Sequence, residues 1–275
     1  MTTEPAVPRR TLTLQPVGGL QSVGVLGVAW RRVPVAGGDL AVAVWGEPTG
    51  GSAVGEPVLA VHGPTGNALV WAGVAGLLDG RPPLLAPDLR GRGASAGLPG
   101  PYGPARSAED LLGVLDQVGL ERVVLAAHGA GARTALALTE IAPDRVSRVV
   151  LVDPAGDPSE PAPVATDVFP SREEHRRAWR DHLSLPEPWN GLVTAMVAHD
   201  ALGQEPRVRS ASSSEAVRAD AETGAFAVPE PRVPVRVVTA GETAAPGVGV
   251  SGTTHWTLLL GLRGADAVAR SLSEA

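Results

Sequence analysis

Histidine is the side chain of this sequence best suited to moving protons near neutral pH, because its ordinary pKa lies close to 6.5. The 275 residues include six histidines and no cysteine, which excludes a cysteine nucleophile, disulfide bonds and cysteine-ligated metal sites. Three of the histidines lie in short segments that also contain glycine, namely His62, His128 and His255. The other three, His175, His182 and His199, lack metal-ligand spacing such as HExxH, so we predict no metal site and no cofactor.

The glycine-containing segments lie between predicted strands and helices, and these elements must bring the three histidines into position. Strands are predicted at residues 57–61, 84–86, 123–127, 146–152, 235–239 and 247–250, with a hairpin made by 28–35 and 39–45. Helices are predicted at 68–78, from Ser107 to about Val118, at 132–141 and at 256–272. This alternation predicts an α/β fold in which a parallel sheet is covered by helices on both faces.

Residues 157–232 break this alternation. They contain many prolines, two tryptophans (Trp179 and Trp189) and a helical stretch at 171–183. We predict that they form a cap inserted into the sheet domain, without a second sheet. The core then comprises residues 25–156 and 233–275, and residues 1–24 form an N-terminal extension.

Composition restricts the possible partners. The net charge is −6, and all 23 basic residues are arginines scattered along the chain, so we expect no nucleic-acid partner. The uncharged stretches 11–30 and 243–262 are interrupted by Gly, Pro, Gln or Thr, so we expect no membrane span. The Arg9-Arg10 pair only faintly resembles a twin-arginine signal, and we expect a cytoplasmic protein. The use of arginine without lysine, together with many glycines and prolines, is typical of a GC-rich, actinobacterium-like genome.

Four segments, taken in order, resemble the motifs of the α/β-hydrolase family. They are His62-Gly63-Pro64-Thr65-Gly66, Asp88-Leu89-Arg90-Gly91-Arg92-Gly93-Ala94-Ser95, Ala127-His128-Gly129-Ala130-Gly131 and Gly252-Thr253-Thr254-His255-Trp256. With the elements between them, they extend the resemblance over residues 28–272. The resemblance implies an eight-stranded, mostly parallel sheet with helices on both faces, an inserted cap, and a ligand pocket between the cap and the strand ends.

The sequence departs from active members of this family at the nucleophile and at the oxyanion hole. The family places its nucleophile in the middle of G-x-S-x-G, and here that position is Gly129. The two N–H donors of the family's oxyanion hole correspond to Ala130 and Pro64, and proline has no N–H. Thr65 offers a substitute donor only if the loop is shifted.

The carboxylate that orients the family's catalytic histidine is the third departure. Glu242 follows the strand at 235–239, but it lies too close to His255 for a full helix and strand to intervene. Some relatives take this acid from the end of the preceding strand, where this sequence has Asp153. Two interpretations of Asp153 stay open: it orients His255, or it is a structural residue before Pro154, which we favour.

The histidines also have alternative interpretations. His255 is either a general base or a polar residue at a helix start that is hydrogen-bonded to Thr253 or Thr254. For His62 and His128 we favour packing of the loop and the elbow over a direct role in chemistry.

These departures lead to three hypotheses about function. We favour a protein that has lost the serine nucleophile and binds a small, largely apolar ligand or a partner beneath the cap. The residues expected to line its pocket are Gly63, Pro64, Thr65, His128, Gly129, Ala130 and Trp256.

The second hypothesis is an enzyme in which His255, oriented by Asp153 or Glu242, is the general base. Lyase, isomerase, hydratase, cofactor-free oxygenase and water-mediated hydrolase chemistry are all compatible with it. The third hypothesis is a hydrolase with a displaced nucleophile at Ser95, Ser251 or Thr254.

Overall fold

The computed structural model describes residues 27–48, 55–154, 168–183, 189–221, 232–242 and 247–274. The predicted N-terminal extension lies outside these ranges, as do parts of the predicted cap. Within them, eight strands form one sheet in the order β1-β2-β4-β3-β5-β6-β10-β11. Their bounds are Ala29–Val35 (β1), Gly38–Trp45 (β2), Val58–Val61 (β3), Leu84–Pro87 (β4), Val123–His128 (β5), Val146–Val152 (β6), Val235–Ala240 (β10) and Val248–Val250 (β11).

The sheet is mostly parallel, as the resemblance implied. The strand β2 pairs antiparallel with β1 and with β4, and all the other neighbours are parallel. The strands β3 to β6 are short and mostly apolar, which is expected where helices cover both faces of a sheet.

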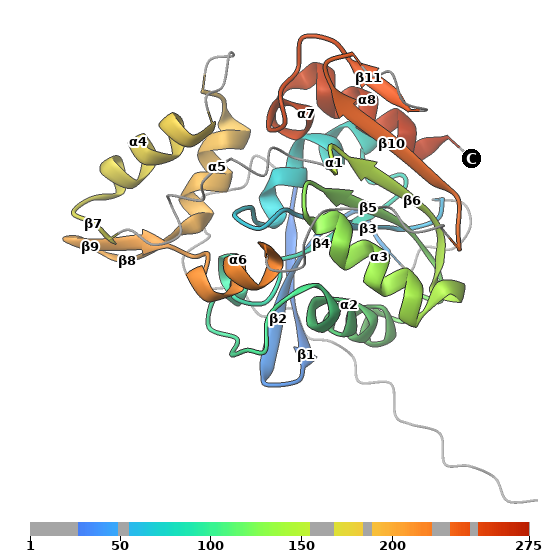
Figure 1. The fold of residues 1–275 in the computed structure, drawn as a ribbon, viewed down its shortest axis with the longest axis horizontal. Helices are drawn as coiled ribbons and strands as arrows, with labels where there is room; N and C mark the ends of the chain where they lie inside the picture. Colours follow the sequence, from blue (N-terminus) through green and yellow to red (C-terminus); the bar gives the residue numbers. More distant parts are fainter. Residues whose placement is uncertain are drawn as a thin grey trace, which may run out of the picture.

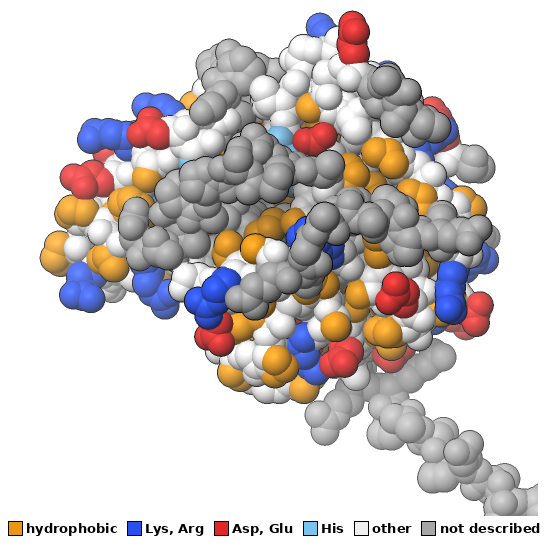
Figure 2. Space-filling view, viewed as in Figure 1, with side chains coloured by type: hydrophobic (Ala, Val, Ile, Leu, Met, Phe, Trp, Pro, Cys, Tyr) orange, Lys and Arg blue, Asp and Glu red, His pale blue; other side chains and the backbone are white. Residues whose placement is uncertain are grey.

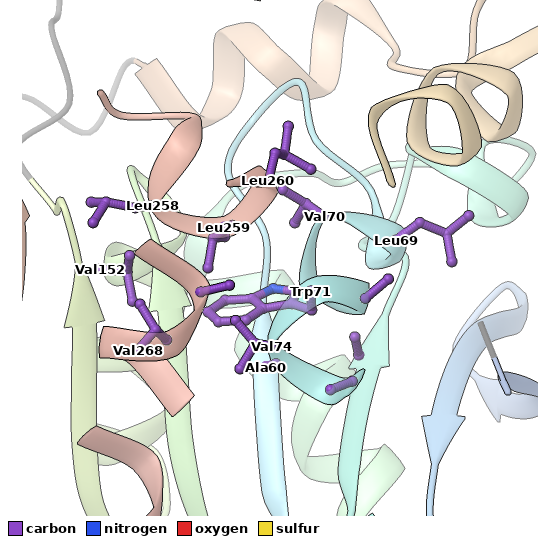
Figure 3. Packing of buried hydrophobic residues seen from close by; sticks show 14 of the residues in the cluster. Ala60, Leu69, Val70, Trp71, Val74, Val152, Leu258, Leu259, Leu260 and Val268 are labelled. Atoms are coloured by element: carbon purple, nitrogen blue, oxygen red, sulfur yellow. The ribbon is translucent and has the colours of Figure 1, made fainter. Parts of the chain in front are cut away.

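The helices divide between the two faces of the sheet. They are α1 (Ala72–Leu78), preceded by a 3-10 turn over Ala68–Trp71, α2 (Pro104–Val118), α3 (Gly131–Ile141), α7 (Thr257–Leu260) and α8 (Leu262–Ser273). Alternate strand residues pack with α1, α7 and α8 in one apolar cluster, and the intervening ones pack with α2 and α3 in another. In Figure 3 the indole of Trp71 lies among Ala60 of β3, Val74, Leu259 and Val268.

Two helix boundaries differ from the prediction. The helix expected to begin at Ser107 begins at Pro104 instead, because proline suits the first helical position and Gly103 takes a positive φ of 107° just before it. The single helix expected at 256–272 is divided at Gly261, whose extended backbone separates α7 from α8. At Gly264 a Cβ would lie 2.4 Å from Leu258 Cα, so this glycine allows α8 to cross close to α7.

The described residues of the predicted cap include a second sheet, so the expectation of a cap without one was wrong. The strands β7 (Val168–Phe169), β8 (Ala201–Gln204) and β9 (Arg207–Ser210) form an antiparallel sheet in the order β7-β9-β8. The helices α4 (Arg172–Leu183), α5 (Gly191–Asp200) and α6 (Ser214–Ala221) accompany it. Figure 1 shows α4, α5 and this small sheet to the left of the central sheet.

Two buried ion pairs join these elements to the core. His199 of α5 lies 2.6 Å from the carboxylate of Asp88, which follows β4, and Arg92 lies 2.5 Å from Asp220 of α6. Burial lowers the pKa of His199, but the nearby Asp88 outweighs burial and raises this pKa above its usual value. No sequence motif contains both partners of either pair, so these contacts could not be predicted from the sequence.

Charge is mixed on the molecular surface. Figure 2 shows basic and acidic side chains interspersed over one face of the molecule. In the described ranges, no helix combines the length and the apolar character needed to cross a bilayer.

Candidate functional site

The turn after β5 keeps the geometry of a nucleophile elbow without a side chain to attack a substrate. Gly129 has a positive φ of 54°, and its N–H donates to the carbonyl of Val152 at 2.9 Å. The helix α3 begins at Gly131, where a Cβ would lie 2.5 Å from the carbonyl oxygen of His62. The close approach of loop and helix therefore requires glycine at 131, and the left-handed backbone at 129 favours it there.

Asp153 and His255 form a hydrogen-bonded pair beside this elbow. Asp153 Oδ2 lies 2.7 Å from His255 Nδ1, and the two side chains are 21% and 19% exposed. Asp153 directly follows β6 and has a positive φ of 46°, which is uncommon for a residue other than glycine. Its N–H donates to the carbonyl of Val238 at 2.7 Å, which holds the backbone of this residue against β10.

The other nitrogen of His255 faces the elbow. The point that a Cβ on Gly129 would occupy lies 3.2 Å from His255 Nε2 and 3.0 Å from Cε1. The pair thus has the arrangement of a catalytic histidine and its orienting acid, with Nε2 directed at the position where the family carries its nucleophile. Glu242, the alternative acid, is exposed.

The loop after β3 forms a tight turn with Pro64 at its second position. The N–H of Gly66 donates to the carbonyl of Gly63 at 3.1 Å, and the Pro64 carbonyl accepts from Arg92 Nε at 3.0 Å. The Thr65 carbonyl faces Ser212 Oγ at 3.4 Å. Of the two positions that supply oxyanion-hole donors in the family, Ala130 at the start of α3 retains its N–H and Pro64 has none.

His62 packs and orients this loop. It is fully buried, its Nδ1 lies 2.7 Å from the Gly63 carbonyl, and its Nε2 accepts from the N–H of Leu89 at 3.0 Å. Because a carbonyl only accepts, Nδ1 carries the proton and the ring is neutral. Burial lowers the pKa of His62 from 6.5 to about 4, in spite of the nearby Asp88 carboxylate.

We expect His62 to make stability depend on pH in mildly acidic solution. Between pH 6.5 and about 4 the unfolded chain binds a proton at His62 that the folded protein does not, so the free energy of unfolding falls as the pH falls through this window. The shift corresponds to about 3 kcal/mol. The pair of His199 and Asp88 acts outside this window, since the pKa of His199 is raised and that of Asp88 is lowered.

Urea unfolding of the native protein and of His62→Gln across this pH range checks the prediction. The variant should show a shallower dependence on pH, while a slope equal to that of the native protein would contradict the assignment. Burial also lowers the pKa of His128, so part of the slope should remain in the variant.

His128 and Trp256 flank His255. His128 Nε2 lies 3.0 Å from the His255 carbonyl oxygen, and the centroids of the two rings are 4.1 Å apart. The ring of Trp256 is 5.6 Å from that of His255 and contacts Trp179 and His182 of α4 edge-on. The helix α4 therefore packs directly against the residue that follows the candidate base.

The hydroxyl groups considered as displaced nucleophiles are those of Ser95, Ser251 and Thr254. Ser95 is buried, and its Oγ accepts from the N–H of Ala41 at 2.9 Å. Thr254 Oγ1 lies 3.3 Å from Thr257 Oγ1 at the start of α7, and Ser251 is exposed. Ser95 Oγ therefore has a structural role as a hydrogen-bond acceptor. The positions of Thr254 and Ser251 give no support to a nucleophilic role.

Sequence reasoning missed the buried histidine pairs. His175 lies 3.0 Å from Asp200, which also accepts from Trp179 and from Ser210, and this cluster fixes the cap elements to one another. In the part of the chain that the structure describes, no group of three or more potential ligands is placed to hold a metal ion.

Comparisons with known proteins agree with this architecture. Residues 56–185 match a family described as alpha/beta hydrolase fold. The chain is 37% identical over 100 residues to a protein named "Putative carbamate hydrolase RutD" of Caulobacter segnis, covering 36% of this chain and 38% of that protein. It is 36% identical over 98 residues to lipase LipV of Mycobacterium tuberculosis, covering 36% of this chain and 37% of that protein. The match therefore spans less than two fifths of the length of these relatives.

Solved structures are similar over most of the chain. The crystal structure of E-2-(acetamidomethylene)succinate hydrolase has a TM-score of 0.73 at 20% identity, covering 90% of this chain and 98% of that one. The enol-lactonase from Burkholderia xenovorans LB400 has a TM-score of 0.63 at 23% identity, covering 87% and 97%. At this identity the likeness concerns the fold.

Proposed function

We propose that this chain, which has the α/β-hydrolase fold, is an enzyme in which His255, oriented by Asp153, is a general base that works without a serine nucleophile. The observation that carries the proposal is the 2.7 Å hydrogen bond between His255 Nδ1 and Asp153 Oδ2 beside an elbow that holds Gly129.

The hydrogen bonds around His255 favour a base over a leftover polar residue. A residue of the latter kind was expected to bond to its neighbours Thr253 or Thr254. Instead, Thr253 Oγ1 donates to the Val250 carbonyl and Thr254 bonds to Thr257, while His255 Nδ1 reaches a carboxylate 102 residues away. With Nδ1–H donated to Asp153, the lone pair of Nε2 is free to accept a proton from the side of Gly129.

The departures at Gly129 and Pro64 restrict the chemistry. An acyl-enzyme needs a nucleophile and is helped by two oxyanion donors, and this chain lacks the serine and one of the donors. We therefore propose that His255 acts directly on the reactants. It takes a proton either from water or from an acidic C–H of a small, largely apolar substrate. In the first case the water oxygen attacks the carbonyl carbon of an ester, the bond from that carbon to the alkoxy oxygen breaks, and the protonated His255 returns the proton to the departing alcohol.

A binding protein without turnover is the second candidate, and the loss of both the nucleophile and an oxyanion donor favours it. The relatives named as a lipase and as a carbamate hydrolase support the enzyme, though only as similar proteins. The two candidates differ in one measurable respect, which is whether His255 is needed for any turnover.

Turnover of short-chain p-nitrophenyl esters, and deuterium exchange into a 1,3-diketone, test the two modes of the proposed base. We expect turnover above buffer in the native protein and a loss of about 10²–10⁴-fold in His255→Ala, which is the usual contribution of a general base. A fluorophosphonate probe should leave the native protein unlabelled, since residue 129 offers no hydroxyl.

The matched control is His175→Gln, which removes another buried histidine from the cap and should leave turnover unchanged. If native protein and His255→Ala both stay at the buffer rate in both assays, the enzyme proposal fails. Stabilisation by small apolar ligands in a thermal-shift screen would then support the binding protein.

Restoring serine at position 129 is expected to give only weak esterase activity. The Cβ would lie 3.2 Å from His255 Nε2, so the ring needs to shift by only a few tenths of an ångström. The missing donor at Pro64 remains, and a single oxyanion donor contributes about 10²–10³-fold in kcat. We expect Gly129→Ser with Pro64→Ala to exceed Gly129→Ser alone by about 10²-fold in kcat/KM. Equal activity of the two variants would contradict this account of the loop.

A further inference from the structure

We propose that His128 is a positioning residue for the base His255, a role that rests on the proposed function. His128 is the last residue of β5 and is 1% exposed. Its Nε2 lies 3.0 Å from the backbone carbonyl oxygen of His255, and its ring lies 4.1 Å from the ring of His255 with 32° between the planes. His128 thus contacts both the backbone and the side chain of the base.

The protons of His128 can be assigned from its partners. A carbonyl oxygen only accepts, so Nε2 carries a proton and donates it to His255. Burial, and secondarily the neighbouring His255, lower the pKa of His128 well below its usual value, so the ring is neutral and Nδ1 carries no proton. The neutral ring adds no charge beside His255 when that residue becomes protonated.

Simple packing does not explain a histidine here. Among the residues that the structure describes, Nδ1 of His128 has no hydrogen-bond partner. A buried acceptor without a donor is unfavourable, and an apolar ring would fill the same space without that cost. The feature that an apolar ring cannot supply is the donation from Nε2 to His255.

The two strands next to the elbow therefore hold the base at two points. His128 pairs with Val152 in the register of β5 and β6, and Asp153 directly follows Val152. His128 fixes the backbone carbonyl of His255 and Asp153 fixes Nδ1 of its ring. With both points fixed, Nε2 is held toward Gly129, and loss of the first would let the loop that carries His255 move.

The test compares two substitutions of His128. His128→Gln keeps a side-chain N–H near the position of Nε2, whereas His128→Phe keeps an aromatic ring and removes the donor. The measurement is the low-field proton NMR signal of His255 Nδ1–H, which is identified by its loss in Asp153→Asn and needs no substrate. We expect the native protein and His128→Gln to have similar rates of solvent exchange at this proton, and His128→Phe to exchange at least about ten-fold faster.

An exchange rate in His128→Phe equal to that of the native protein would overturn the positioning role. If His128→Phe does not fold, His128→Asn takes its place, because its shorter amide cannot reach the His255 carbonyl, and the same rates decide. If the native protein gives no signal that Asp153→Asn removes, the proposed function fails, since its base is not held by Asp153.

Turnover provides a second readout. On whichever ester or diketone the native protein turns over, His128→Phe should lower kcat with little change in KM, and His128→Gln should restore it. A fall of equal size in both variants would overturn the positioning role and leave the proposed base intact.

Discussion

Replacing Asp110 by asparagine is expected to lower the free energy of unfolding by about 3–5 kcal/mol. Asp110 of α2 is buried and holds Arg90 by two parallel bonds, Nε to Oδ2 and Nη2 to Oδ1, each 2.8 Å long. The remaining donors of Arg90 reach the carbonyls of Pro99 and Ala36 at 2.7 and 2.8 Å. Asparagine preserves the shape of the side chain but leaves the buried guanidinium without its counter-charge, and this accounts for the large cost.

Glu109→Gln is the matched control, since it removes a carboxylate from the adjacent position of the same helix. Glu109 pairs with Arg106 at 2.6 Å, but its side chain is 59% exposed, so we expect a change of at most about 1 kcal/mol. Urea unfolding monitored by circular dichroism measures both variants. Equal, small losses in the two variants would mean that the Arg90–Asp110 pair contributes no more than an exposed pair.

The central sheet could be predicted because most of its strands have a clear pattern in the sequence. The runs at β3, β4, β5 and β6 are short and rich in Val, Leu and Ala, and each was predicted within a residue or two of its observed bounds. The small sheet of the cap lacks these signals. The strand β7 has two residues, and β9 is Arg-Val-Arg-Ser with a single apolar residue, so neither stands out as a strand in the sequence.

The candidate site was predictable only where a motif marks it. The segments around Gly129 and His255 were found because they stand in the order typical of the family. The partner of His255 was left between Asp153 and Glu242, because that choice depends on which strand ends lie together, and local sequence does not specify this. The order β6-β10-β11 brings the end of β6 to the loop before α7, and so places Asp153 at His255.

The buried pairs were unpredictable for the same reason. Asp88 and His199 are 111 residues apart, and Arg92 and Asp220 are 128 apart. The pairs join the loop after β4 to α5 and to α6, so they exist only after these helices have packed against the central sheet domain. The arginines of that loop, Arg90 and Arg92, likewise have buried carboxylate partners, Asp110 and Asp220, that lie outside the motif.

Asp153→Asn should reduce kcat/KM by about 10²–10⁴-fold on the ester or diketone that the native protein turns over fastest. The carboxylate accepts the proton on Nδ1 and so keeps the lone pair of His255 on Nε2, toward Gly129. An asparagine amide can donate to Nδ1 instead, which places the proton on Nε2 and removes the acceptor from the reacting side. The backbone of residue 153 has a positive φ of 46°, which asparagine also tolerates, so the fold should be preserved.

Glu242→Gln separates this effect from a general change in charge. Glu242 is the other carboxylate considered as the orienting acid for His255. Because Glu242 is exposed, we expect the rate of Glu242→Gln to lie within about two-fold of that of the native protein. Thermal unfolding of both variants checks that the fold is intact. A large loss in Glu242→Gln with none in Asp153→Asn would move the orienting acid to Glu242, whereas native rates in both would show that the histidine works without a carboxylate.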